Sequence, residues 1–404
     1  MHVWKNEKVK NAVMLGTLCS LLYLSVYFAR NILGAVTPQI LEEGRFSTEY
    51  IGGLSSWFFA FYAVGQLING IIGDRVKARN MLSCGLLMAG VCNALLPGLL
   101  PWSVPASVVY GMTGYFLSMI YGPMTKTVAE NTEPLHAVRC SLGYTFASFF
   151  GSPLAGVAAA ALAWQTAFYL SGGVLMAMAA VCFAGFLWFE KRGIVTYGRY
   201  SEKEKQRGSI RPLLERQIVK FTLVSIVTGV IRTTVVFWIP TYVAQYLGFS
   251  ARASAGIYTV STLAISSAAF LAAVLYEKLG RNMDRTLLVS FFVSALSFLL
   301  MYLVRQPVCN LVCLVLAITA ANCASTMMWS WYCPSLRDTG MVSSATGFLD
   351  FVSYMAAAVS STLFAEAVTT IGWKNLIMIW FVLMAFGTVL CVRDGLRKNK
   401  EGNI

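Results

Sequence analysis

The amino-acid sequence predicts an all-α membrane protein whose transmembrane helices form two six-helix bundles. Of its 404 residues, 57% belong to the hydrophobic set and only 12% are charged, whereas soluble globular proteins carry roughly 25% charged residues. The apolar residues form successive runs, each long enough for a helix to cross a hydrocarbon core of about 30 Å. A polar segment near the middle of the chain divides these runs into two sets, and several landmarks recur in both.

We expect about twelve transmembrane helices. Their predicted ranges are 12–43, 47–72, 80–99, 102–126, 138–162, 164–189, 217–247, 253–276, 286–304, 308–332, 341–366 and 372–392. Basic residues concentrate in alternate loops, as the positive-inside rule requires of cytoplasmic segments. These residues include Lys5, Lys8 and Lys10, then Arg75, Lys77 and Arg79, then Lys278, Arg281 and Arg285, and finally Arg393, Arg397, Lys398 and Lys400. Both termini are therefore expected in the cytoplasm, and the net charge of +13 indicates membrane orientation rather than a nucleic-acid partner.

Several other classes of function find no support in the sequence. Most of the ten cysteines lie inside apolar runs, where buried, inert thiols are expected. Neither His2 nor His136 lies in a cluster with metal-ligand spacing, and no Walker or dinucleotide pattern follows a strand. We therefore predict no metal, no cofactor and no enzymatic activity, and we expect any transport to be driven by gradients.

The longest polar stretch lies between the sixth and seventh predicted helices. It carries both signs of charge with a basic surplus and is expected to be a solvated cytoplasmic linker. The predicted organisation is an N-terminal six-helix bundle at 1–189, a linker at 190–216 and a C-terminal six-helix bundle at 217–404.

The two predicted bundles look like repeats related in parallel. Arg30 is followed eight residues later by Pro38, and Arg232 is followed eight residues later by Pro240. An offset of about 203 residues also matches Phe46-Ser47 with Phe249-Ser250, and Asp74-Arg75 with Glu277-Lys278. Transporters are often built from such halves, whose first helices flank a central cavity. Arg30 and Arg232 are therefore predicted to meet at that cavity.

A guanidinium near the middle of a membrane helix costs roughly 2.5–3.5 kcal/mol on insertion scales. Two such cations facing one cavity repel each other, and a bound dianion would relieve that repulsion through bidentate hydrogen bonds. Phosphate is the first candidate anion and carboxylate the second. The alternative is that each arginine pairs permanently with a protein carboxylate, for which Asp350 is the candidate deep in a predicted span.

Other polar side chains share helix faces with these charges. Tyr27 precedes Arg30 by three residues, Tyr62 and Gln66 are four apart, and Tyr354 follows Asp350 by four, so each pair lies on one helix face. The tyrosines could bind substrate or serve packing alone. Asp350 could neutralise an arginine, take up a coupling proton or bind a substrate hydroxyl, and these alternatives stay open.

Four segments resemble a known family. Asp74-Arg75-x-x-x-Arg79 is similar to the signature loop of the major facilitator superfamily, whose fold has twelve helices in two bundles. The stretches "YFARNILGAVTPQI", "VIRTTVVFWIPTYV" and "SSATGFLDFVSYMAAAVSS" resemble helices 1, 7 and 11 of its organophosphate:phosphate antiporters.

The resemblance implies roles for individual residues. It implies that Arg30 and Arg232 grip the phosphoryl group and that Tyr27, Tyr62 and Tyr354 line the cavity. Shared helix faces add Gln66 and Asp350 to the predicted substrate site, and Trp238 is added because it lies in one of the matching segments. We also expect the acid-base loops of the two halves to help close the cytoplasmic side, through Asp74, Arg75, Arg79, Glu277 and Arg281. Gln66 and Ala147 stand where the glycerol-3-phosphate carrier has a lysine and a histidine, and Asp350 replaces a small residue. These departures argue against glycerol 3-phosphate itself as the substrate.

The sequence thus predicts a secondary active transporter that exchanges a phosphorylated metabolite for inorganic phosphate by alternating access. We expect a monomer in a bacterial inner membrane, with a small anion, phosphate and in some cases a proton as its only partners besides lipid. One alternative is a proton-coupled symporter for sugar acids or carboxylates, a group that often carries a glutamine like Gln66. A carrier-like sensor of sugar phosphates is another. A drug:proton exporter fits poorly, because two arginines would repel lipophilic cations.

Overall fold

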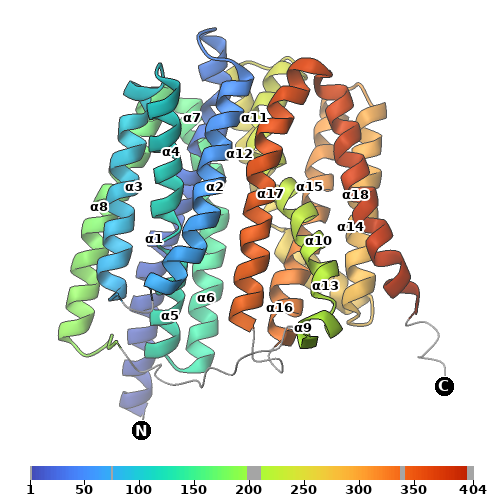
Figure 1. Cartoon of the computed structure of the whole chain (residues 1–404). Helices are drawn as coiled ribbons and strands as arrows, with labels where there is room; N and C mark the ends of the chain where they lie inside the picture. Colours follow the sequence, from blue (N-terminus) through green and yellow to red (C-terminus); the bar gives the residue numbers. More distant parts are fainter. Residues whose placement is uncertain (1, 74–75, 198–210, 337–341, 398–404) are drawn as a thin grey trace. The chain divides into compact units, whose positions relative to one another are not determined.

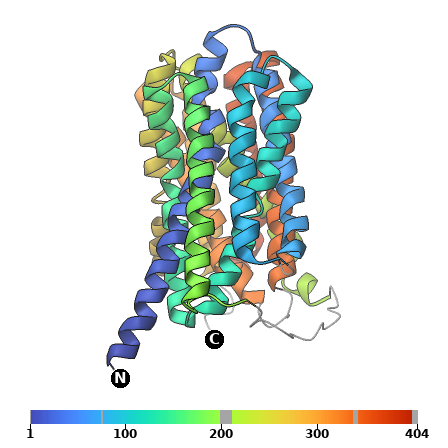
Figure 2. The same cartoon turned by 90° about the vertical axis from the view of Figure 1, so that its left-hand side faces the viewer.

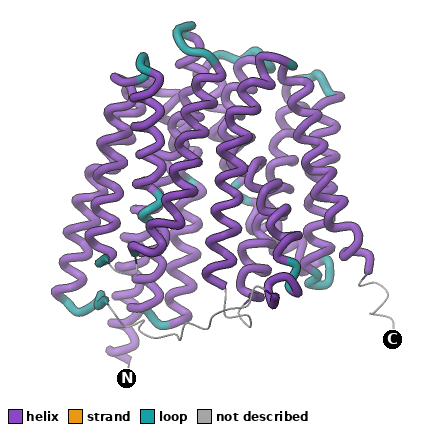
Figure 3. Tube along the Cα trace, viewed as in Figure 1, coloured by secondary structure: helices purple, strands orange, loops and turns teal. Residues whose placement is uncertain are grey.

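The computed structural model describes residues 2–73, 76–197, 211–336 and 342–397. Within these ranges the chain is helical, with short turns between helices and no strand (Figure 3). Contacts between residues divide the chain into two compact units. The first comprises Met1–Phe46, Gly53–Glu204 and Ala251–Thr259, and the second comprises Ser47–Gly52, Lys205–Ser250 and Val260–Ile404.

Eight helices occupy the N-terminal part of the chain (Figure 1). They are α1 (His2–Glu42), α2 (Thr48–Ile72), α3 (Ala78–Leu99), α4 (Ser103–Leu117), α5 (Tyr121–Asn131), α6 (Pro134–Phe149), α7 (Gly151–Ala161) and α8 (Trp164–Lys191).

The C-terminal part contains ten described α-helices and two π-helical segments, η1 and η2. In chain order they are α9 (Arg211–Glu215), α10 (Ile218–Gly229), η1 (Val230–Val235), α11 (Val236–Gln245), α12 (Ala251–Ile265), α13 (Ala268–Lys278), α14 (Met283–Leu303), α15 (Pro307–Met327), η2 (Met328–Tyr332), α16 (Cys333–Ser335), α17 (Val342–Thr370) and α18 (Gly372–Arg397).

Ten described helical segments are long and apolar enough to cross a membrane, and the two remaining predicted spans are each broken in two. The span predicted at 102–126 is divided into α4 and α5, and the span predicted at 138–162 into α6 and α7. Proline lies just after each break, Pro123 after the first and Pro153 after the second. Because proline has no N–H to donate to the carbonyl four residues earlier, it weakens helical continuity there.

Small residues let neighbouring helices approach closely within the first unit. α3 runs beside α8 (Figures 1 and 2), and a Cβ added to Gly90 would lie 2.8 Å from the Gly172 carbonyl oxygen. The Asn93 side chain donates a hydrogen bond to Ser171 Oγ at 2.8 Å across the same pair of helices. This packing is typical of membrane helices, which associate through close backbone approach and interhelical hydrogen bonds.

Large apolar side chains remain exposed along the spans in both units. Leu142 is 65% exposed, and Val260 and Val389 are each 69% exposed. In water such surfaces would drive association, whereas hydrocarbon solvates them. The helices and their exposed apolar faces confirm the predicted all-α membrane protein.

Candidate substrate-binding site

Arg30 lies on α1, and its guanidinium is enclosed by aromatic rings of the first unit. Its Cζ is 5.4 Å from the ring centroid of Tyr27, 5.6 Å from that of Phe59 and 5.0 Å from that of Tyr62. We call these three rings the Arg30 cage. Each ring face attracts the cation, with about 0.5–2 kcal/mol depending on how fully the pair is desolvated. The cage thus stabilises a charge inside a membrane helix without cancelling it.

The cage is held in place from α2 and α4. Tyr62 is buried and stacks on Phe58 with centroids 6.2 Å apart, and Phe58 in turn contacts Tyr110 of α4 at 5.0 Å. Further along α2, the buried Asn69 amide donates to Ser118 Oγ at 2.7 Å. These contacts fix the rotation of α2, so that Tyr62 and Phe59 both face Arg30.

Tyr27 belongs to a second group, the tyrosine cluster formed by Tyr23, Tyr27, Tyr121 and Tyr144 from α1, α5 and α6. The Tyr23 ring lies 4.9 Å from Tyr27, 5.6 Å from Tyr121 and 6.0 Å from Tyr144. The Tyr23 hydroxyl donates to the Tyr27 hydroxyl at 3.5 Å. The cluster therefore gathers tyrosine rings from three helices beside the Arg30 cage, with the Tyr23 and Tyr27 hydroxyls hydrogen-bonded.

Gly151 allows α7 to lie against α1 at this point. A Cβ added to Gly151 would lie 2.4 Å from Tyr27 Cβ and 2.6 Å from the Tyr27 carbonyl carbon. Real Cβ atoms do not approach so closely, so glycine is required for this packing.

Gln66 lies one helical turn beyond Tyr62 on α2 and is half-buried. The predicted shared face is therefore present. Within the described part of the chain the Gln66 amide forms no hydrogen bond, and its binding to substrate stays a prediction.

In the second unit, Arg232 lies inside the π-helical segment η1. Its Cζ is 5.8 Å from the ring centroid of the buried Tyr354 on α17. Such π-helical insertions in longer helices occur frequently at functional sites. The sequence predicted a regular span at this position.

Contacts with α17 explain where η1 lies. Thr234 Oγ1 donates to the Ala357 carbonyl at 3.1 Å and lies 2.8 Å from Ser360 Oγ. Gly229 is the last residue of α10, immediately before η1. A Cβ added to it would lie 2.3 Å from Ser353 Oγ, so α10 and α17 are in contact there. Side-chain hydrogen bonds to the neighbouring helix thus position the segment that carries Arg232.

Asp350 is half-buried on α17, one turn before Tyr354. Asp350 and Tyr354 are therefore one turn apart on α17, as their spacing predicts, and the Tyr354 ring contacts Arg232. Trp238 differs, because its indole is fully buried and packs against Trp373 with centroids 6.5 Å apart. A substrate-binding role for each of these residues stays a prediction.

The predicted cytoplasmic gate is described only in part, because Asp74 and Arg75 lie outside the described residues. Arg79 at the start of α3 forms an ion pair with Glu190 of α8, with Nη1 and Oε2 2.7 Å apart. Tyr197 donates its hydroxyl hydrogen to Glu190 at 2.9 Å, and burial is the main cause that raises the pKa of Tyr197. Arg79 therefore joins α3 to α8 and to the first residues after α8.

In the corresponding region of the second unit, Glu277 and Arg281 are exposed. Arg281 has a φ of 58°, and its backbone N–H donates to the Tyr276 carbonyl at 2.8 Å, which ends α13. An ion pair between Lys220 of α10 and Asp284 of α14 connects helices here, with Nζ and Oδ1 3.1 Å apart. Both side chains are nearly buried.

Several of these residues were not anticipated from the sequence. Phe59 stands three residues before Tyr62 and Tyr23 four before Tyr27, so helical spacing could have added both. Glu190 and Asp284 had no such signal, because each pairs with a basic residue far away in the chain.

Comparison with known proteins identifies the family. Residues 19–361 match the model of the Major Facilitator Superfamily. The membrane sensor protein UhpC of Escherichia coli (strain K12) is 37% identical over 73 residues, which are 18% of this chain and 17% of the sensor. The glucose-6-phosphate exchanger SLC37A2 of Danio rerio is 19% identical over 409 aligned residues, covering 87% of this chain and 79% of the exchanger.

Solved structures share the fold at low sequence identity. A bacterial homolog of the human lysosomal transporter Spinster has a TM-score of 0.78 at 12% identity, covering 95% of this chain and 97% of its own. A D-xylose-proton symporter has a TM-score of 0.73 at 13% identity with the same coverages. With the family match over most of its length, the chain belongs to the major facilitator superfamily and has the fold of its transporters.

Proposed function

We propose that this protein is a secondary active transporter that moves a phosphorylated small metabolite across the membrane in exchange for inorganic phosphate. In this proposal Arg30 and Arg232 both bind the phosphoryl group, and alternating access carries it across. One relative supports the substrate class, since it is named as a glucose-6-phosphate exchanger. The resemblance of the segments that carry Arg30 and Arg232 to organophosphate carriers supports it as well.

The observation that carries the proposal is the Arg30 cage. Aromatic faces hold the guanidinium at 5.0–5.6 Å while leaving its charge intact, so the cation retains its attraction for an anion. A phosphoryl group offers paired oxygens to the planar guanidinium and accepts strong charge-assisted hydrogen bonds. The aromatic rings then also keep the guanidinium plane oriented when the site is empty.

The test is transport in proteoliposomes made with the purified protein. Uptake of labelled phosphate or of a labelled sugar phosphate is measured with and without unlabelled phosphate inside. We expect rapid uptake only when phosphate is preloaded, with no stimulation by an inward proton gradient. Proton-driven uptake into phosphate-free vesicles would instead indicate the organic-anion symporter.

A sensor is the second candidate, and the identity with the membrane sensor UhpC over 73 residues favours it. A sensor would bind the sugar phosphate without moving it. Ligand-dependent thermal stabilisation together with no measurable flux in the same preparation would support the sensor and contradict exchange.

The cellular location is part of the same proposal. The distribution of basic residues in the sequence supports cytoplasmic termini in a bacterial inner membrane. Labelling of single cysteines placed in the loops of intact cells would test this orientation.

A further inference from the structure

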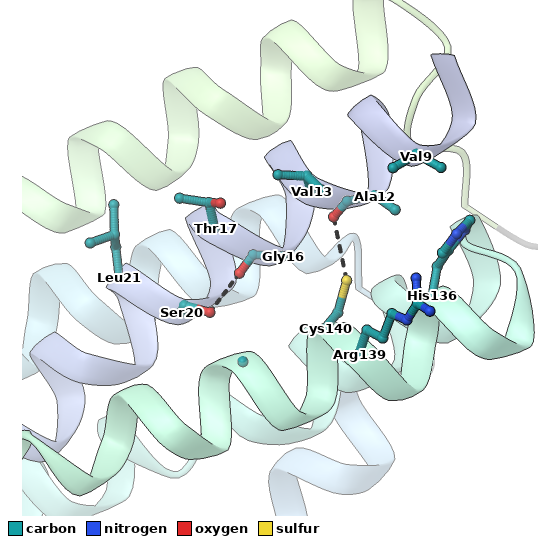
Figure 4. A pocket seen from close by; sticks show the side chains of 11 residues that line it. Val9, Ala12, Val13, Gly16, Thr17, Ser20, Leu21, His136, Arg139 and Cys140 are labelled. Carbon is teal, nitrogen blue, oxygen red and sulfur yellow. Dashed lines mark hydrogen bonds between the residues drawn. The ribbon is translucent and has the colours of Figure 1, made fainter. Parts of the chain in front are cut away.

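A groove lies between α1 and α6 in the first unit, away from the Arg30 cage. It has a volume of about 310 Å³ and is lined by Val9, Ala12, Val13, Gly16, Thr17, Ser20, Leu21, His136, Arg139, Cys140 and Gly143. Figure 4 shows His136 and Arg139 at one end and Leu21 at the other. From Val9 to Leu21 the groove follows α1 over a rise of about 18 Å, at 1.5 Å per residue.

Close helix packing forms the floor of this α1–α6 groove. Cys140 Sγ donates to the Ala12 carbonyl at 3.3 Å (Figure 4). A Cβ added to Gly16 would lie 2.8 Å from Cys140 Sγ. The two helices touch along this line, so the hollow above it is a groove on the surface of the unit.

The walls of the groove continue into apolar surface. On α1, Val13 is 60% and Leu21 50% exposed, and on α6, Leu142 is 65% and Phe146 49% exposed. α1 belongs to a segment long and apolar enough to cross a membrane, and α6 overlaps the span predicted at 138–162. Exposed leucine, valine and phenylalanine in such segments face hydrocarbon, so the groove opens toward lipid.

Positive charge gathers at one end of the groove. Arg139 is exposed on the same face of α6 as Leu142, and within the described residues it makes neither a hydrogen bond nor an ion pair. Lys10 is also exposed near this end. The acidic Glu133 is engaged by Lys8 at 3.0 Å and lies 3.9 Å from His136 Nδ1, so it does not cancel the charge of Arg139.

We propose that the α1–α6 groove binds one anionic phospholipid. Its phosphate lies at Arg139, with Lys10 and His136 nearby, and one acyl chain lies along Val13, Thr17 and Leu21. The length of about 18 Å is comparable with one leaflet, which is half of a hydrocarbon core of about 30 Å. Basic pockets between transmembrane helices at the membrane surface suit such head groups.

A lipid explains both parts of the groove, whereas a free anion would use only one. Inorganic phosphate could occupy the basic end, but it would leave the apolar walls without a ligand. An uncharged or zwitterionic lipid would fill the walls but gain less from Arg139. The proposal does not depend on which substrate the protein transports.

The experiment uses delipidated, detergent-purified full-length protein titrated with phosphatidylglycerol, and native mass spectrometry to count bound lipids. Phosphatidylcholine is the comparison lipid, and inorganic phosphate is added as a competitor. We expect the wild-type protein to bind phosphatidylglycerol more tightly than phosphatidylcholine at its tightest site. Arg139→Gln should weaken phosphatidylglycerol binding about fivefold, which is the effect of losing one basic residue near a lipid surface.

Two further variants make the result specific. Lys191→Gln removes one exposed positive charge from the end of α8 and should leave the tightest site unchanged. Thr17→Phe, at an exposed position in the groove, should weaken binding of both lipids because the ring occupies the space of the acyl chain. All three variants are expected to melt like the wild type, because the replaced side chains make no described hydrogen bond.

Three results would overturn the proposal. These are equal weakening by Arg139→Gln and Lys191→Gln, equal wild-type affinity for the two lipids, and displacement of the lipid by millimolar inorganic phosphate. The last result would assign the basic end of the groove to a free anion instead.

Discussion

Substitution of Gly151 by alanine tests whether the contact between α7 and α1 supports the Arg30 cage. The added Cβ would lie 2.4 Å from Tyr27 Cβ, about 1.1 Å inside the roughly 3.5 Å at which carbon atoms make favourable contact. Either α7 or the Tyr27 backbone must therefore move by about 1 Å. Overpacking of this kind costs about 1–3 kcal/mol.

The same movement reaches Arg30. Its Cζ lies 5.4 Å from the Tyr27 ring centroid, and a shift of about 1 Å away would exceed the roughly 6 Å limit for a cation–π contact. Losing about 0.5–2 kcal/mol lowers the ratio of correctly oriented to misoriented guanidinium about two- to thirtyfold. We therefore expect Gly151→Ala to lower both thermal stability and the rate of phosphate exchange.

Gly122→Ala is the matched control. Gly122 is likewise in the first turn of a short helix, α5, and a Cβ there meets nothing within 4 Å. Alanine should be neutral or stabilising at this position by up to about 1 kcal/mol. Thermal unfolding of both purified variants gives the comparison, and a Gly151→Ala protein that melts and exchanges like Gly122→Ala would refute the reasoning.

Three other predictions concern charged side chains. Glu190→Gln should destabilise the protein by about 1–3 kcal/mol. This is less than the 3–5 kcal/mol lost on breaking a fully buried pair, because the Glu190 and Arg79 side chains are 20% and 15% exposed. An unchanged melting temperature would contradict this. Lys220→Met removes the ion pair of Lys220 Nζ with the nearly buried Asp284 carboxylate and should cost a similar amount. Lys220→Met/Asp284→Leu should recover part of this cost. If the double variant melts lower than the single one, the pair is not the cause. Asp350→Asn should retain exchange driven by internal phosphate, and a selective loss of proton-driven uptake would favour the symporter.

Much of the fold could be predicted because it depends on local composition. The apolar runs and their lengths located the ten segments that are long and apolar enough to cross a membrane, and the family match confirms the fold class. The breaks within the fourth and fifth spans were missed, although Pro123 and Pro153 were visible. The sequence alone does not say whether a proline in a membrane helix kinks, breaks or is tolerated, since neighbouring helices determine how the freed carbonyls are satisfied.

The parts of the candidate site that depend on residues close together in the sequence could be predicted. The shared faces of Tyr27 with Arg30 and of Asp350 with Tyr354 followed from helical spacing. The π-helical segment around Arg232 could not be predicted, because the hydrogen bonds that accompany it join Thr234 to residues of α17, which are far away in the chain. Trp238 shows the same limit, since its packing against the distant Trp373 leaves no trace in either local sequence.

The central claim is that two arginines, one from each half of the chain, bind the phosphoryl group. Counterflow of labelled phosphate in preloaded proteoliposomes tests it most directly, with Arg30→Lys and Arg232→Lys compared to Arg305→Lys, an exposed arginine between α14 and α15. Lysine keeps the charge but loses one of two charge-assisted hydrogen bonds worth about 1.5–3 kcal/mol. We predict a ten- to hundredfold weaker apparent affinity for phosphate in each site variant, about the range that this energy gives, and no change in the control. Wild-type counterflow in both Arg30→Lys and Arg232→Lys would contradict the account.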